Sequence, residues 1–323
     1  MVVTSTDDNI DATLPPSIFP RDGSAIDRID KVISGPIFRL QLGIVLEYLL
    51  SVPGCFFGMP STMLIGPGIL AVTTTTTTQN NRMLPVIILG IIISTLILRW
   101  AYCHWTSNLK WGFYGRKIFL IAPCIGTVLT YAITDDPIAQ CAGNFYLLSW
   151  LMVLIPVLFL KRLTYRRRPI ASSVVHLGKS SALAGQKSKS LDWICHMLRT
   201  GDSNASFPSG DVAGSVTFAY PLWRYHQGGT SSVGVVPVII VFLSAFGRMY
   251  WHAHHALDVI VAMIIAYCCC SILDATLSSS FHTESGNTYP IVAWYYPYIA
   301  MLGVIVQQKL LPQKFVGWKK KSK

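Results

Sequence analysis

The feature that most constrains this chain is a succession of long apolar runs that carry almost no charge. Hydrophobic residues make up 52% of the 323 residues and charged residues only 13%, whereas a soluble domain has about 25% charged residues. A helix needs about 20 mostly apolar residues to cross a bilayer. The pattern therefore predicts an all-α, polytopic transmembrane helical bundle, with spans near residues 40–57, 84–104, 117–134, 144–160, 211–225, 233–249, 257–275 and 290–308.

The polar stretches set the expected domain limits. We expect a polar N-terminal tail over residues 1–32, a multi-span membrane domain over 33–310 and a basic C-terminal tail over 311–323. Residues 61–72 are too short for an easy span and are consistent with a re-entrant segment. Surfaces for helix packing and for lipid contact look alike in such a sequence, so the oligomeric state is left open.

The net charge of +11 predicts an anionic partner, because an excess of Lys and Arg attracts lipid headgroups, phosphate or nucleic acid. The sequence contains no recognisable DNA- or RNA-binding motif, and most basic residues lie beside apolar runs. The composition therefore favours membrane lipids and a phosphate-bearing ligand, and it argues against nucleic acid.

A basic segment, residues 161–169 (KRLTYRRRP), begins where a long apolar helix is predicted to end. Basic clusters at a membrane boundary commonly bind anionic headgroups. By itself, this segment therefore supports a role in anchoring the chain to lipid.

A Pro-Ser-Gly segment, residues 207–211 (FPSGD), opens a later apolar helix. Glycine permits close approach of the backbone to a ligand. The free N–H groups and positive dipole of a helix start favour an anion there. The alternative is an ordinary junction between a loop and a helix, where Pro, Ser and Gly are common.

A His-Asp segment, residues 247–258 (GRMYWHAHHALD), joins two predicted spans. His254 and Asp258 are four residues apart, so they share a face on a helix. A carboxylate bonded to one imidazole nitrogen fixes the tautomer and leaves the other nitrogen as a nucleophile or base. The alternatives are a structural histidine and a metal site built from His252, His254 and His255.

Topology should bring these three segments to one membrane surface. The helix ending at Lys161 and the helix opening at Asp211 share one face. The next span returns the chain to that face near Arg248, and the following span starts near His254. We therefore expect the three segments to converge, although they are far apart in the sequence.

Together, the three segments resemble the signature of the type 2 phosphatidic acid phosphatase superfamily. That family includes lipid-phosphate phosphatases, glucose-6-phosphatase and, more distantly, vanadium haloperoxidases. The matching pattern is Lys-x6-Arg-Pro, then Pro-Ser-Gly-x, then Arg-x5-His-x3-Asp, between Lys161 and Asp258. The resemblance implies a phosphatase core over about residues 144–275 and a two-step phosphoryl transfer.

The same resemblance implies a role for each matching residue. His254 attacks phosphorus and becomes a phosphohistidine, while Asp258 orients it and stabilises its positive charge. Fixed positive charge stabilises this kind of transition state, so neither a metal nor a cofactor is expected. The groups expected to hold the phosphoryl oxygens are the side chains of Lys161, Arg168 and Arg248, the backbone amides of Ser209 and Gly210, and the Ser209 hydroxyl.

One position departs from the family pattern. The family usually has His where this chain has Asp211, and that His protonates the leaving oxygen. Aspartate in water loses its proton at about pH 4, and an ionised carboxylate is a poor acid that repels a phosphate dianion. The outcomes are a phosphatase with an acidic optimum, an enzyme in which His196, His252 or His255 supplies the proton, or a non-catalytic binder. We expect an active enzyme and keep Asp211 among the catalytic candidates.

The position of the site at the bilayer surface predicts a lipid phosphate monoester as substrate. Phosphatase is the first interpretation, and a lipid phosphotransferase or a non-catalytic binder are the alternatives. Arg162, Arg166 and Arg167 lie off the motif positions and are assigned to lipid anchoring. The positive-inside rule favours a cytoplasmic site, and residues 320–323 (KKSK) resemble a dilysine signal of the endoplasmic reticulum membrane. The glycosylation sequon at Asn204 would instead fit a lumenal site.

Overall fold

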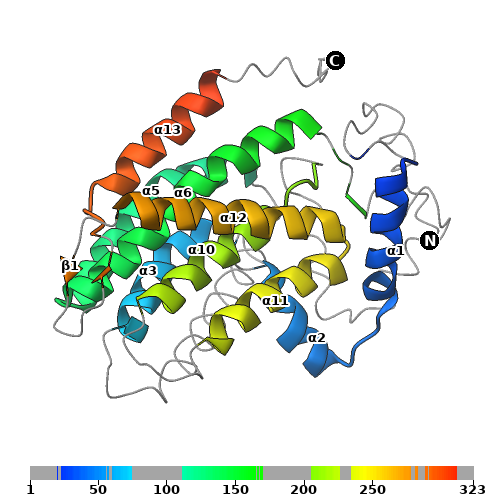
Figure 1. Cartoon of the computed structure of the whole chain (residues 1–323), viewed down its shortest axis with the longest axis horizontal. Helices are drawn as coiled ribbons and strands as arrows, with labels where there is room; N and C mark the ends of the chain where they lie inside the picture. Colours follow the sequence, from blue (N-terminus) through cyan, green and yellow to red (C-terminus); the bar gives the residue numbers. More distant parts are fainter. Residues whose placement is uncertain are drawn as a thin grey trace.

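The chain folds into a group of packed helices (Figure 1). The computed structural model describes residues 20, 23–55, 57, 60–74, 111–164, 166, 168–169, 205–225, 234–277, 281–282, 288–289 and 291–310. Two short strands, β1 (Phe281–His282) and β2 (Thr288–Tyr289), pair antiparallel. The other elements in these residues are helical: α1 (Ala25–Arg39), α2 (Ile44–Ser51), the 3-10 helix η3 (Val52–Cys55), α3 (Pro60–Thr74), α5 (Trp111–Ile133), α6 (Pro137–Thr164), α10 (Gly210–Arg224), α11 (Val235–Tyr250), α12 (Ala256–Leu277) and α13 (Tyr296–Leu310).

The all-helical prediction is confirmed, apart from the small β1–β2 pair. Two of the described helices, α6 and α12, are long and apolar enough to cross a membrane. Shorter apolar helices cover Ala122–Ile133, Val235–Tyr250 and Tyr296–Gln307. The span expected near 84–104 and the tail 311–323 lie outside the described residues, and a polytopic bundle stays a prediction.

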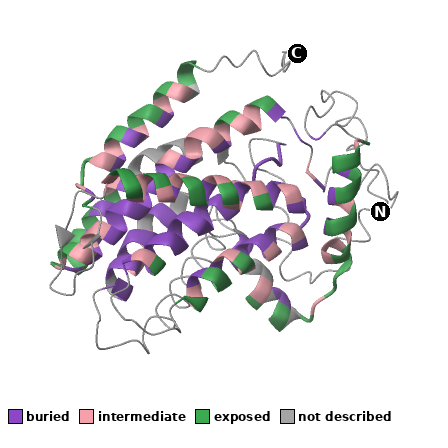
Figure 2. Ribbon diagram, in the orientation of Figure 1, coloured by how far each residue is buried: buried purple, intermediate pink, exposed green. Residues whose placement is uncertain are grey.

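Helix α6 lies at the centre of the fold. It packs against α3, α5, α10, α12 and α13, and its buried side chains include Phe145, Tyr146, Leu147 and Leu151. Figure 2 shows the buried residues gathered on the inner helices, whereas exposed residues line the outer ones. The central helix thus carries Lys161, at its last turn, on a rigid support.

The expected span at 40–57 is wrong as a continuous helix. The α-helix ends at Ser51, and a 3-10 turn containing Pro53 and Gly54 follows, because proline lacks the N–H that a helix interior needs. A Cβ atom at Gly54 would lie 2.6 Å from the Cα of Gly247. Only glycine allows this approach of two backbones, so the segment packs against the end of α11.

Gly214 allows a second close approach, between α10 and residue 57. A Cβ atom at Gly214 would lie 2.3 Å from the carbonyl oxygen of Phe57. The same oxygen accepts a hydrogen bond of 3.2 Å from the Trp150 indole of α6. The helix that opens at the Pro-Ser-Gly segment is therefore seated on both α6 and the N-terminal part of the chain.

Helix α1 lies across one end of α12 (Figure 1). Ser24 caps it by accepting a hydrogen bond of 3.2 Å from the Asp27 amide. The helix continues to Arg39, so the boundary that we expected at residue 32 falls inside one element. The physical reason is that Asp27, Asp30 and Ser34 lie on one helix face and are buried against the protein, whereas we expected a polar N-terminal tail over residues 1–32.

Candidate active site

The His-Asp segment forms a tight turn between α11 and α12. The carbonyl oxygen of Arg248, in the last turn of α11, accepts hydrogen bonds from the amides of Ala253 (3.0 Å) and His254 (3.3 Å). His252 closes the turn in the left-handed region, with φ at 55°. These bonds hold His254 directly before α12, where it is only 1% exposed.

The imidazole of His254 lies between a cation and a carboxylate. Its Nε2 is 3.1 Å from Nη2 of Arg248, and its Nδ1 is 3.7 Å from Oδ2 of Asp258, which is longer than a hydrogen bond. Because a guanidinium only donates, the contact with Arg248 requires the lone pair on Nε2. The neutral ring therefore carries its proton on Nδ1, on the side of Asp258.

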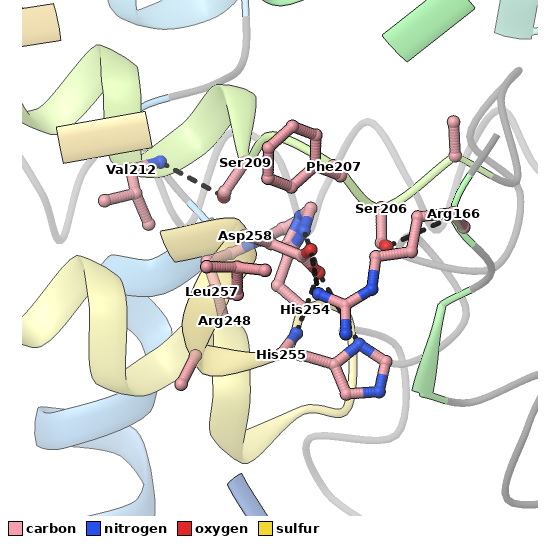
Figure 3. A network of polar contacts seen from close by, with 12 residues as sticks. Arg166, Ser206, Phe207, Ser209, Val212, Arg248, His254, His255, Leu257 and Asp258 are labelled. Atoms are coloured by element: carbon pink, nitrogen blue, oxygen red, sulfur yellow. Dashed lines mark hydrogen bonds and ion pairs between the residues drawn. The ribbon is translucent and has the colours of Figure 1, made fainter. Parts of the chain in front are cut away.

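Asp258 connects the three motif segments (Figure 3). Its Oδ2 accepts a hydrogen bond of 2.9 Å from the His255 amide, which is one half of a helix capping box. Its backbone carbonyl accepts from the Ser209 amide at 3.0 Å. Its Oδ1 lies 2.6 Å from Nη1 of Arg166. One carboxylate residue thus fixes the start of α12, the Pro-Ser-Gly segment and the basic segment relative to each other.

The prediction that Arg166 anchors the chain to lipid is wrong, because its side chain is buried and paired within the protein. Its side chain is 2% exposed, and its guanidinium lies 2.6 Å from Asp258, 2.5 Å from Asp30 and 3.6 Å from Asp27. Burial acts to lower the pKa of Arg166, but the charges of Asp258 and Asp30 outweigh it and raise that pKa above its ordinary value. Arg166 is therefore a buried cation that holds Asp258 in place.

Helix α1 supplies side chains that cap α12. The Ala256 amide donates to Oγ of Ser34 at 2.9 Å, and the Leu257 amide donates to Oδ1 of Asp30 at 2.8 Å. The first turn of a helix leaves four amides without partners, so these bonds stabilise the helix start beside His254. The available signal in the sequence was the helical spacing of Asp30 and Ser34.

Three predicted cations act on His254. Burial, followed by the positive charges of Arg248, Arg168 and Lys161, lowers the pKa of His254 well below its ordinary value. Burial and the charge of Arg248 lower the pKa of Arg168 to about 10. Nζ of Lys161 donates to the Ala205 carbonyl at 3.1 Å, which ties the end of α6 to the chain just before the Pro-Ser-Gly segment. The structure therefore brings the motif cations together.

Ser209 is the N-cap of α10. Its Oγ accepts a hydrogen bond of 3.4 Å from the Val212 amide, and its own amide donates to Asp258. The amide that we expected to contact phosphate is therefore already bonded, and the Ser209 hydroxyl hydrogen is the group left for a ligand. A Cβ atom at Gly210 would meet nothing within 4 Å, so there is open space at the helix start.

Asp211 forms an ion pair next to the imidazole. Its Oδ2 is 2.9 Å from Nη2 of Arg248, the same nitrogen that contacts His254. Arg248 is itself only 4% exposed. Arg248 therefore bridges Asp211 and His254, and it holds the Asp211 side chain at the edge of the site.

The other histidines of the segment have different surroundings. Nε2 of His252 is 3.0 Å from the carbonyl oxygen of Phe38 in α1, and the two rings stack. Nδ1 of His255 is 3.6 Å from Asp258. The described part of the chain contains no group of three or more His, Cys, Asp or Glu side chains placed to hold a metal ion. His196, Arg167 and Asn204 lie outside the described residues.

Comparison with known proteins gives one family match. Residues 142–278 match the family model of the PAP2 superfamily, whose members are generally phosphatases. No curated protein and no solved structure matches the chain. The matched segment begins within α6 and ends just after α12, so it contains all three motif segments. The chain therefore carries a PAP2 superfamily domain over residues 142–278, as its three motifs predicted.

Proposed function

We propose that this protein is a membrane-embedded lipid-phosphate phosphatase that works through a phosphohistidine at His254, without a metal. The observation that carries the proposal is the environment of His254. Its Nε2 lone pair is directed at Arg248, and its proton-bearing Nδ1 is directed at Asp258. A buried neutral imidazole beside several cations is suited to attack an anionic phosphoryl group.

In the first step, Nε2 of His254 attacks phosphorus, an N–P bond forms, and the P–O bond to the lipid alcohol breaks. Arg248 has to release the Nε2 lone pair, and phosphoryl oxygens are the stronger acceptors for its guanidinium. As the ring becomes positively charged, the negative charge of Asp258 stabilises it from the Nδ1 side. Arg166 keeps Asp258 in position through its ion pair.

In the second step, water attacks phosphorus and the N–P bond breaks, which releases inorganic phosphate and neutral His254. Lys161, Arg168 and Arg248 stabilise the charge on the equatorial oxygens in both steps. The Ser209 hydroxyl donates to the same group. These cations supply the charge neutralisation that a metal ion supplies in other phosphoryl transfer enzymes.

The leaving alcohol needs a proton, and Asp211 is the candidate donor by position. Its ion pair with Arg248 means that it donates only after it has itself been protonated. We therefore propose an acidic optimum. The same ion pair supports a second candidate function, a non-catalytic lipid-phosphate binder, since Asp211 places a negative charge where the leaving group would need an acid.

The outer faces of the apolar helices support the membrane part of the proposal. On α12, Ile260, Ile264 and Ile272 are exposed, and an exposed aliphatic face is typical of lipid contact. The site lies at the ends of α6 and α12, which would place it at the bilayer surface, within reach of a lipid headgroup. The basic residues at 320–323 support an endoplasmic reticulum membrane as the location.

The test is phosphate release by the purified chain in detergent, with EDTA, from phosphatidate, lysophosphatidate, a sphingoid phosphate and a polyprenyl phosphate. We expect turnover that His254→Ala abolishes and that His282→Ala, in the remote strand β1, leaves intact. Transfer of phosphate to an added alcohol would identify a phosphotransferase. Binding of these lipids without turnover in any condition would instead establish the binder.

A further inference from the structure

Helix α1 is amphipathic in the opposite sense to a helix on the surface of a soluble protein. Such a helix turns its apolar side chains inward and its polar ones outward. In α1 the buried side chains are Asp27, Asp30 and Ser34. The exposed ones include Ile26, Ile29, Val32 (74% exposed) and Ile33.

Buried contacts of the inner polar face prevent α1 from rotating about its axis to bury these aliphatic side chains. Asp30 is held by Arg166 at 2.5 Å and by the Leu257 amide at 2.8 Å. Ser34 is held by the Ala256 amide. Because these contacts are buried and charged, rotation of α1 would break them, and the apolar face stays directed outward.

The position of α1 indicates what covers that face. Its inner face caps the first turn of α12, one of the two long apolar helices, and its axis runs across that of α12 (Figure 1). If α12 crosses a bilayer, its start lies at headgroup level. A helix across that end lies in the plane of the membrane surface, with its apolar side available to the lipid.

Charge indicates which lipid surface fits. Arg28 and Arg39 are exposed, and neither forms an ion pair within the described ranges. They are eleven residues apart, about three turns, so they lie on the same side of the helix. Val32 is four residues from Arg28 and seven from Arg39, so the two cations border the apolar face. Cations beside an apolar face are typical of helices that bind anionic lipid surfaces.

We infer that α1 is an interfacial helix that binds an anionic bilayer surface through this apolar face and its bordering arginines, while its inner face holds Arg166 and the start of α12. The helix thus connects the lipid surface to the residues around His254. The inference needs no turnover, so it stands or falls separately from the proposed phosphatase activity.

The test uses the full-length chain with the photo-crosslinking residue p-benzoylphenylalanine in place of Val32 or Ile29. The protein is reconstituted in nanodiscs of phosphatidylcholine, with and without phosphatidylglycerol, then irradiated and analysed by mass spectrometry. We expect lipid adducts in which phosphatidylglycerol exceeds its share of the bilayer. Arg28→Gln and Arg39→Gln should each reduce that enrichment by about fivefold, the effect of one cation beside an anionic leaflet.

Each other product would overturn the inference and identify what covers the face. A cross-linked dimer would show a second copy, and an internal cross-link would show another segment of the same chain. A folded chain without lipid adducts would show a face open to water. Phosphate release from the same nanodiscs reports on catalysis independently, so failure of one proposal is distinguishable from failure of the other.

Discussion

The guanidinium of Arg166 lies 2.6 Å from the carboxylate of Asp258 in the protein interior. Asp258 in turn lies 3.7 Å from Nδ1 of His254, so the pair sets where the carboxylate stands relative to the candidate nucleophile. On its other side, Arg166 reaches Asp30 of α1. Arg166 is therefore a positioning residue, which acts on His254 through Asp258.

Arg166→Ala should abolish turnover and destabilise the fold. It would leave Asp258 and Asp30 buried without their cation, which costs about 3–5 kcal/mol for a broken buried pair. Thermal unfolding in detergent, together with phosphate release, measures both effects. Arg166→Lys keeps the charge but loses the two-pronged geometry, so we expect partial rescue of stability and a slower rate. Lys309→Gln removes an exposed cation of α13 and serves as the control, which should change neither the stability nor the rate. Equal losses of rate and stability in Arg166→Ala and in this control would contradict the positioning role.

Asp211→Asn should strengthen the binding of inorganic phosphate. The change removes a carboxylate that lies 2.9 Å from Arg248 and so relieves its repulsion of the bound anion. Two charges 4 Å apart in water interact by about 1 kcal/mol, so we expect phosphate to bind at least about fivefold more tightly. Equilibrium binding measures this in His254→Asn and in the double variant, where turnover does not interfere. Unchanged affinity would mean that Asp211 does not face the phosphate.

The enzyme should keep its activity at acid pH. The mechanism requires neutral His254, whose pKa burial and the neighbouring cations lower well below 6.5. Protonation of the nucleophile therefore sets in only well below pH 6.5, and the acid limb of kcat/KM should lie there. The measurement is kcat/KM between about pH 4 and pH 8. In Asp211→His, an imidazole donor should move the optimum upward. A wild-type optimum at or above neutrality would exclude Asp211 as the proton donor.

Gly214→Ala should destabilise the packing of α10. The added Cβ would lie 2.3 Å from the Phe57 carbonyl oxygen, and backbone does not give way easily, so we expect a loss of about 1–3 kcal/mol. The matched control is Gly303→Ala in α13, where a Cβ meets nothing within 4 Å. There the better helix propensity of Ala should stabilise the chain by up to about 1 kcal/mol. Thermal unfolding of the two variants measures this difference. Equal unfolding midpoints for Gly214→Ala and Gly303→Ala would contradict the close packing.

The motif residues could be predicted because their chemistry depends on short spacings. The sequence shows the four-residue interval between His254 and Asp258. It also shows the ends of the apolar helices at Lys161 and Gly210, and together these features predict which side chains meet at the candidate site. Arg166 was missed because its partner Asp30 comes from a segment that carries no family motif. Counting polar residues does not separate a solvated tail from a helix whose polar face points inward.

The contacts between α1 and α12 can form only late in the synthesis of the protein. Ser34 and its partner Ala256 are 222 residues apart, and a ribosome adds about 5–20 residues per second. Roughly ten to forty seconds therefore pass between the synthesis of α1 and that of the α12 amides to which its polar face bonds. During that interval, early adsorption of the apolar face of α1 to a membrane surface would keep the helix formed until α12 has been made.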